Sequence, residues 1–360
     1  METKKAPQIP YGISDFVRMR TENYYYVDKT NYIPLLERYK APVFLRPRRF
    51  GKSLLVSMLA HYYDRNMATQ FKDLFGGTWI GEHPTNEHNQ YLVVRYDFST
   101  TSVASKKEDI EKNFNAVNCS PLRTLVERNR DLFGDFRFRE DGNASNMLVE
   151  VCEFISSHNL PPLYILIDEY DNFTNQLLVV YKDSLYQDLT TGESFLRTFF
   201  KVIKAGIGEG TIRTSFCTGV LPVTMDDLTS GSNIAEMLTL KPEFTNLLGF
   251  THEEAAQYLK YVINKYGPQA SFEELWTLIL NNYDGYHFLP NAEPLFNSTI
   301  LTYFLKNFAE LKGGIPTEMV DENLRTDTSW IRRLTITLDN AKEMLDSCLL
   351  YTSPSPRDRG

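Results

Sequence analysis

Arg46-Pro47-Arg48-Arg49-Phe50-Gly51-Lys52-Ser53 is the stretch that decides the fold of this 360-residue chain. It follows a short apolar run at residues 43–45 and precedes an apolar segment that begins at Leu54. A strand, a short loop that ends in Gly-Lys-Ser and a helix together form the pattern of a phosphate-binding P-loop. The stretch therefore predicts a site for the phosphates of a nucleotide between a strand and a helix.

The chemistry of phosphate binding explains the residue types. Backbone N–H groups in the loop and in the first helical turn are expected to point at phosphate oxygens, where the helix dipole also favours negative charge. Gly51 lets the backbone approach closely. Lys52 would reach the β- and γ-phosphates, and the Ser53 hydroxyl would ligate Mg²⁺. The residues expected to bind the nucleotide are Arg46, Pro47, Arg48, Arg49, Phe50, Gly51, Lys52, Ser53 and Leu54.

One position departs from the usual pattern G-x-x-x-x-G-K-[ST], because Arg46 stands where the first glycine is expected. Taken alone, this departure leaves a second interpretation open, a basic surface loop in which Arg48 and Arg49 are solvated. The strand before the loop and the helix after it favour the phosphate site.

A second motif, of the Walker B type, begins with a continuous apolar run at residues 163–167 and ends in Asp168 and Glu169. Such a run is typical of a strand that is buried on both faces. Asp168 would hold the Mg²⁺, usually through water, and Glu169 would orient and deprotonate the attacking water. Both carboxylates are expected at the carboxyl end of the strand, where open α/β sheets bind ligands. The alternative is an ordinary acidic exit from a strand.

Two further segments read as strands, at residues 91–99 and 214–220, and residues 193–203 have the apolar spacing of a helix. This alternation predicts a P-loop NTPase fold, an α/β parallel sheet with helices on both faces. Thr218 lies near the end of its strand and is a candidate sensor of the γ-phosphate, with a cap of the following turn as the alternative. The candidate catalytic residues are Glu169, Lys52 and Thr218.

From Thr251 onward the pattern becomes almost wholly helical. Thr251 and Glu254 form a capping box that begins a helix, and further helices are predicted at residues 272–280 and 299–308. Residues 283–286, between the last two of these helices, read as a turn with Gly285 at positive φ. The predicted domains are a lead-in at residues 1–40, a P-loop core at 41–249, a smaller all-helical lid at 250–347 and a non-native or disordered tail at 348–360.

Six short motifs follow one another along the chain: Tyr26-Val27-Asp28-Lys29-Thr30, the octapeptide at 46–53, Ile167-Asp168-Glu169-Tyr170-Asp171, Thr218-Gly219-Val220, Phe250-Thr251-His252-Glu253-Glu254 and Tyr283-Asp284-Gly285-Tyr286-His287-Phe288. In this order they resemble the AAA-ATPase-like family of bacterial proteins, over about residues 8–340. The resemblance implies an ATPase fold that uses ATP and Mg²⁺. It also implies that an arginine in place of the first glycine is usual.

Members of that family commonly continue into a nuclease-like domain of the PD-(D/E)XK type, and we expect this chain to stop before it. After a predicted helix at residues 335–345, the composition changes to Ser, Pro and Arg. We interpret residues 348–360 as translated read-through, with a genuine disordered tail as the alternative. Three arginines could each meet the γ-phosphate as an arginine finger or lie on a solvated helix face. They are Arg325, Arg332 and Arg333.

Composition narrows the class of protein. With 42% hydrophobic and 23% charged residues, the chain can bury a large core. The sequence has no apolar run of membrane-spanning length, and its N-terminus lacks a signal peptide, so a cytoplasmic protein is expected. The net charge of −8 argues against general coating of nucleic acid. An unidentified protein or nucleic-acid partner and a homo-oligomer remain open.

Three functions fit these motifs. The first is an ATPase whose hydrolysis drives the lid to open and close, with work passed to a partner or to an attached nuclease. The second is a nucleotide-gated binding module with little turnover. The third is a P-loop kinase that transfers the γ-phosphoryl group. Because Glu169 beside Asp168 favours activation of water over transfer, the ATPase is the function that we predict.

Overall fold

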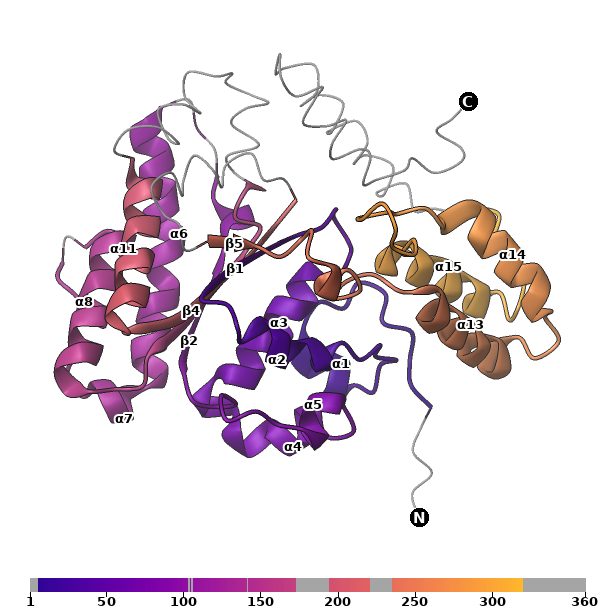
Figure 1. Ribbon diagram of the computed structural model, residues 1–360, viewed down its shortest axis with the longest axis horizontal. Coiled ribbons are helices and arrows are strands. Elements are labelled where there is room, and N and C mark those ends of the chain that lie inside the picture. The colour runs from indigo at the N-terminus through magenta and orange to yellow at the C-terminus, as the bar shows by residue number, and fades with distance from the viewer. Residues whose placement is uncertain are drawn as a thin grey trace. The chain divides into compact units, whose positions relative to one another are not determined.

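The computed structural model describes residues 6–172 apart from 103, 105 and 141, together with residues 194–220 and 235–319. In this part of the chain, strands form one sheet in the order β2-β3-β4-β1-β5 (Figure 1). Every neighbouring pair is parallel. The strands are β1 (Ala41–Leu45), β2 (Leu92–Asp97), β3 (Leu163–Asp168), β4 (Ile212–Gly219) and β5 (Ala235–Met237). The predicted parallel sheet is confirmed.

The interior strand β3 shows why this sequence forms a sheet that is covered on both faces. All six of its residues are buried. Successive side chains of a strand point to opposite faces, so Leu163, Ile165 and Ile167 enter one core cluster. Tyr164 faces the other way and stacks on Tyr63 with ring centroids 4.1 Å apart. An uninterrupted apolar run is therefore what this strand requires.

Three long helices cover one face of the sheet, and they lie on the same side of the strands in both ribbon views. They are α6 (Lys107–Arg128), α8 (Ala144–His158) and α11 (Phe195–Glu209), with the short α7 (Arg130–Phe133) after the first. Phenylalanine rings fill the space beneath them, because Phe114 of α6 packs edge-on against Phe98 and Phe199. The segment between β2 and β3 is thus mainly helical.

Shorter helices lie toward the opposite face in Figure 1. They are α2 (Ile33–Leu36), α4 (Phe71–Phe75) and α5 (Trp79–Glu82), with the 3₁₀ turns η1 (Thr30–Tyr32) and η2 (Arg65–Gln70). A further 3₁₀ turn, η3 (Phe98–Thr100), directly follows β2. The helix that follows β1 is α3 (Lys52–Tyr63), as the P-loop pattern predicts.

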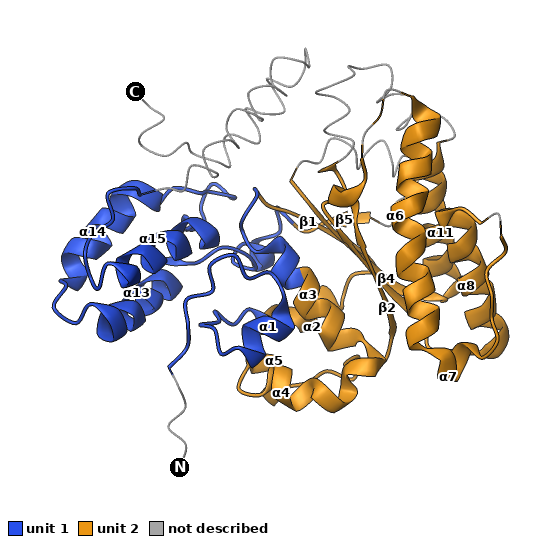
Figure 2. Ribbon diagram, turned by 180° about the vertical axis from the view of Figure 1, so that it is seen from behind, with its two compact units in different colours: residues 1–29, 47–55, 239–360 blue, residues 30–46, 56–238 orange. Residues whose placement is uncertain are grey.

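The chain divides into two compact units (Figure 2). Unit 1 comprises residues 1–29, 47–55 and 239–360, and unit 2 comprises residues 30–46 and 56–238. The sheet belongs to unit 2. The boundary falls within α3, so that residues 47–55 of the P-loop and of the first helical turn group with the helices that follow residue 239.

Unit 1 contains α1 (Phe16–Thr21), η4 (Pro242–Phe244), α13 (His252–Tyr266), α14 (Phe272–Tyr283) and α15 (Ser298–Glu310). The last three share an apolar core to which Leu259, Ile279 and Phe304 belong. The capping box of Thr251 and Glu254 is present at the start of α13. The three predicted helices are thus confirmed. The predicted helix at 335–345, the three candidate arginine fingers and the tail lie outside the described residues.

Two glycines of α11 allow a matched test of the packing between this helix and the sheet. A Cβ atom on Gly206 would lie 2.5 Å from Ile212 Cδ1, whereas one on Gly208 would meet nothing within 4 Å. We expect Gly206→Ala to lower the free energy of unfolding by about 1–3 kcal/mol because it overpacks the core. Gly208→Ala should raise that free energy by about 0.5–1 kcal/mol through helix propensity. Urea unfolding of both variants measures this, and equal midpoints would contradict the described packing.

Candidate nucleotide site

Asp168 and Thr218 meet at the carboxyl edge of the sheet. Both side chains are buried, and the Thr218 hydroxyl donates to Asp168 Oδ1 over 2.6 Å. The other oxygen, Oδ2, lies 3.8 Å from Nη2 of Arg95 on β2. Because β4 lies between β1 and β3, its last residues stand beside the ends of both strands that carry the phosphate motifs. The structure therefore brings together two of the predicted site residues, and Arg95 is a neighbour that the sequence analysis missed.

Glu169 begins a tight turn directly after β3. Its φ angle is +51°, in the left-handed region that few residues other than glycine adopt. Asn172 holds this turn, since its Nδ2 donates to Glu169 Oε2 over 2.7 Å and its backbone N–H donates to the Glu169 carbonyl. The carboxylate that was predicted to activate water thus has a fixed partner. A short amide side chain three residues after Glu169 is the signal that could have identified Asn172 from sequence.

Asp171 fixes the ends of β3 and β4 to each other. Both of its carboxylate oxygens accept from the backbone N–H of Val220, at 3.1 Å each. Gly219 is required at this point, because a Cβ atom there would lie 2.5 Å from Asp171 Oδ1 and from the Tyr170 ring. The third carboxylate of the Asp168-Glu169-Tyr170-Asp171 segment therefore has a structural role that spacing alone did not reveal.

Arg46 directs its side chain into unit 2. The guanidinium lies 4.4 Å from the centroid of the Phe44 ring, and Nη1 donates to the Leu45 carbonyl. Its backbone N–H donates to the Gly219 carbonyl, and this bond continues the pairing of β1 with β4 by one residue. Burial lowers the pKa of Arg46 to about 9, so that it stays positive at neutral pH. An arginine in place of the first glycine is thus accommodated by packing on the sheet.

The remaining P-loop residues belong to unit 1. Gly51 has a φ angle of +95°, which suits glycine, and α3 begins at the next residue. Lys52 is buried, with Nζ donating back across the loop to the Pro47 carbonyl over 3.1 Å. Ser53 and Leu54 follow in the first turn of the helix and are half-buried. The local conformation is that of a loop closed over the lysine at a helix N-terminus.

Phe50 anchors this loop in an aromatic cluster of unit 1. The ring is buried and packs edge-on against Tyr286 and Phe288, with centroids 5.0 and 5.5 Å away. Gly249 leaves room for it, because a Cβ atom there would lie 2.9 Å from Phe50 Cε1. Gly285 has the predicted positive φ, at +134°. The aromatic residues after Gly285 thus pack against the P-loop.

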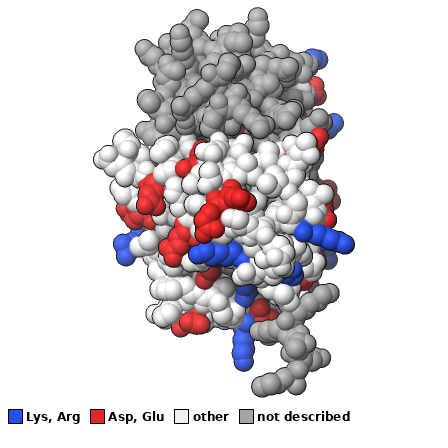
Figure 3. Space-filling model, turned by 90° about the vertical axis from the view of Figure 1, so that its right-hand side faces the viewer, with Lys and Arg blue, Asp and Glu red and all other residues white. Residues whose placement is uncertain are grey.

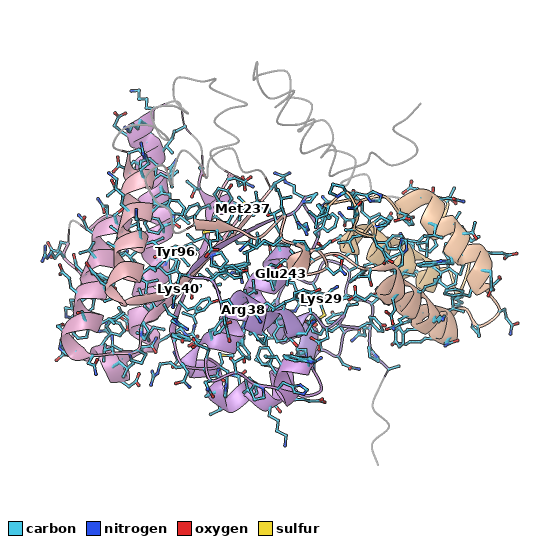
Figure 4. All side chains as sticks on the ribbon, viewed as in Figure 1. Lys29, Arg38, Lys40, Tyr96, Met237 and Glu243 are labelled. Carbon is cyan, nitrogen blue, oxygen red and sulfur yellow. The ribbon has the colours of Figure 1, made fainter. Side chains whose placement is uncertain are left out.

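Residues of other short motifs also contact one another inside unit 1. Lys29, labelled in Figure 4, forms an ion pair of 2.6 Å with Glu254. Burial lowers the pKa of the Lys29 ammonium, and the nearby Glu254 carboxylate opposes that shift. His252 Nε2 lies 3.1 Å from Asp284 Oδ1. These two polar contacts join the N-terminal segment to α13 and α13 to the end of α14.

The two residues predicted to bind Mg²⁺ carry a carboxylate and a hydroxyl group. No cluster of three or more His, Cys, Asp or Glu that could hold a metal occurs among the residues that the structure describes. Mg²⁺ usually takes one or two carboxylates, phosphate oxygens and water, and Asp168 and Ser53 offer a carboxylate and a hydroxyl oxygen. Each residue thus has the chemical type that Mg²⁺ binds, and their assignment to one ion stays a prediction.

The surface adds two observations. On the described part of the face in Figure 3, basic and acidic side chains lie among one another, without a continuous basic patch. In the part of the chain that the structure covers, no helix has both the length and the apolar character needed to cross a membrane.

Comparison with known proteins gives three likenesses. The model of the family described as predicted AAA-ATPase matches residues 10–229. The "Uncharacterized protein in vnfD 5'region" of Azotobacter chroococcum mcd 1 is 25% identical over 256 residues, which are 69% of this chain and 44% of that protein. This chain thus spans less than half the length of that relative. The Walker-type ATPase PABY2304 of Pyrococcus abyssi aligns with a TM-score of 0.42 at 13% identity, over 94% of this chain and 79% of that one.

The hydrogen bond between Thr218 and Asp168 can be tested by stability. Thr218→Val keeps the shape of the side chain but removes the only hydroxyl donor that the structure gives to buried Asp168 Oδ1 among the described residues. We expect the free energy of unfolding to fall by about 1–3 kcal/mol. Thr218→Ser keeps the donor and serves as the control. Urea unfolding at neutral pH is the measurement, and a valine variant as stable as the serine variant would show that the bond contributes nothing.

Proposed function

Because this chain belongs to the predicted AAA-ATPase family, we propose that it binds ATP with Mg²⁺ and hydrolyses it. One observation carries the proposal. β1, which leads into the P-loop, and β3, which ends in Asp168, are parallel strands of one sheet, and Thr218 of the strand between them is bonded to Asp168. The carboxyl edge of such a sheet is where ligands bind in open α/β folds.

The proposed roles divide between phosphate binding and metal binding. The backbone of residues 46–54 would bind the triphosphate, and Lys52 would give up its contact with Pro47 to reach the β- and γ-phosphates. Ser53 and Asp168 would hold Mg²⁺, whose charge offsets that of the phosphates. Thr218 would keep one oxygen of Asp168 in place, and so would act as a positioning residue at the end of β4.

Glu169 would supply the base. Its carboxylate would take a proton from a water molecule as the water oxygen bonds to the γ-phosphorus and the bond from that phosphorus to ADP breaks. Asn172 supports this role, because it holds Oε2 and leaves Oε1 as the second acceptor of the carboxylate. The strained backbone of Glu169 supports it further, since strained conformations cluster at functional sites.

Hydrolysis would then change the conformation of the helices that follow residue 250. The support for this coupling is that Phe50 of the P-loop packs on Tyr286 and Phe288, directly after α14. A movement of the loop by even one ångström would disturb a close-packed aromatic cluster. The work would pass to an unidentified protein or nucleic-acid partner, or to a nuclease-like domain in a longer protein, and the setting would be the cytoplasm.

Two substitutions separate binding from hydrolysis. We expect Lys52→Ala to abolish binding of a fluorescent ATP analogue, because the ammonium that meets the phosphates is lost. Glu169→Gln should keep binding and reduce phosphate release by about 10²–10⁴-fold, the usual contribution of a general base. Glu127→Gln is the matched control, since it makes the same chemical change on an exposed residue of α6. Titration with the analogue and steady-state phosphate release measure the two effects.

The remaining outcomes distinguish the alternatives. Tight binding by the unmodified chain without phosphate release would replace the ATPase with a nucleotide-gated binding module. Absence of binding would show that the P-loop of this chain does not hold a nucleotide.

A further inference from the structure

The N-terminal turn of α15 donates hydrogen bonds to the backbone of the P-loop, and all the residues concerned belong to unit 1. Asn297 Nδ2 donates to the Arg48 carbonyl over 3.2 Å. The Arg49 carbonyl accepts from three donors, which are Ser298 Oγ at 3.2 Å, Thr299 Oγ1 at 2.8 Å and the backbone N–H of Thr299 at 3.3 Å. Two consecutive carbonyls of the loop are therefore held by one helix, about 250 residues later in the chain.

These bonds act where the loop is strained. Arg49 has a φ angle of +71°, a left-handed conformation that costs free energy for a residue with a Cβ atom. Such a conformation persists only when the surroundings enforce it. The three donors on the Arg49 carbonyl supply that enforcement, and Thr299 Oγ1 makes the shortest of the three contacts.

The donors are themselves fixed. Asn297 is buried, and its Oδ1 accepts from the N–H groups of Thr299 and Ile300, which caps α15. Its Nδ2 is directed at Arg48 by the same geometry. The segment before it is paired with the start of α13, because Phe250 and Phe296 exchange two backbone hydrogen bonds. The turn that contacts the P-loop thus directly follows Phe296, a residue of the core of unit 1.

Peptide geometry links the hydrogen bonds on the loop carbonyls to the direction of the loop N–H groups. A peptide unit is planar and trans, so that its N–H group points away from its C=O group. A hydrogen bond that fixes the carbonyl of Arg48 also fixes the N–H of Arg49, and one that fixes the carbonyl of Arg49 fixes the N–H of Phe50. Donation to a carbonyl also polarises the peptide and strengthens its N–H as a donor.

We propose that Thr299, supported by Asn297, is a positioning residue for ATP, which sets the direction of the loop N–H groups that meet the phosphates. This inference rests on the proposed function. The start of α15 would then determine nucleotide affinity without touching the nucleotide. By linkage the coupling is reciprocal, so that bound ATP stabilises the start of α15 to the same degree.

Three variants of the full chain test the proposal. Thr299→Val removes the hydroxyl and keeps the shape, and it should raise the Kd for a fluorescent ATP analogue with Mg²⁺, and the KM for ATP, by about tenfold, the effect of one hydrogen bond. The kcat should stay within about twofold, because Thr299 would act on binding in the ground state and in the transition state alike. Thr299→Ser, which restores the donor, should return the Kd to within about threefold of the unmodified chain.

Thr302→Val is the matched control. Thr302 lies one turn further along α15, is buried, and donates its hydroxyl to the Ser298 carbonyl over 2.6 Å. This substitution removes a hydroxyl hydrogen bond of the same kind that does not reach the P-loop. The Kd should therefore remain unchanged even if the unfolding midpoint falls. An equal loss of affinity in Thr302→Val and Thr299→Val would reduce the effect to general destabilisation and overturn the proposal.

Hydrogen exchange on the unmodified chain gives a test that needs no variant. Addition of ATP with Mg²⁺ should slow exchange of the amides at residues 297–301, and the amides of α14 should change much less. Binding of ATP without any protection at the start of α15 would overturn the inference and leave the proposed function intact. Failure of the unmodified chain to bind ATP would instead overturn the proposed function, and the inference with it.

Discussion

The parallel pairing of β4 with β1 on one side and β3 on the other is the constraint on which the candidate site depends. Parallel strands end at one edge of a sheet, so the segments after β1 and β3 leave from that edge although more than 100 residues separate them in the chain. On the strand between them, the Thr218 hydroxyl donates to Asp168, and the Gly219 carbonyl accepts from the backbone N–H of Arg46. Sheet pairing and these two small residues at the end of β4 therefore fix the ends of the strands from which the two motifs begin.

The elements that the sequence predicted well are those whose pattern is local. The apolar run of β3, the Gly-Lys-Ser start of α3 and the Thr-x-x-Glu box of α13 each carry their signal within a few residues. The P-loop could be identified for the same reason, since its glycine and lysine act through a helix N-terminus that follows at once. Burial of Arg46 was not predictable in this way, because the Phe44 ring and the Gly219 carbonyl become its neighbours only when the sheet forms.

Contacts over long sequence distances account for the rest of what was missed. Asn297 and Thr299 read as an ordinary helix start, and only the fold brings their side chains to Arg48 and Arg49. The segment around Gly285 reads as a turn with positive φ. The positive φ is observed, but the packing of Tyr286 and Phe288 on Phe50 was not predicted. Several motifs of the family resemblance thus describe one packing problem. Two of them, residues 46–53 and 283–288, meet in the aromatic cluster of Phe50, Tyr286 and Phe288.

The P-loop is close to energetic balance, which suits a site that must respond to a ligand. A non-glycine residue in the left-handed region costs about 1–3 kcal/mol. A carbonyl has two lone pairs, so the three donors around Arg49 make about two good hydrogen bonds, which contribute about 1–3 kcal/mol at 0.5–1.5 kcal/mol each. Taken alone, these two contributions are of the same size. A ligand can shift such an equilibrium only by its difference in affinity for the two conformations. Under the proposed function, a phosphate that accepts from correctly directed N–H groups would have that difference.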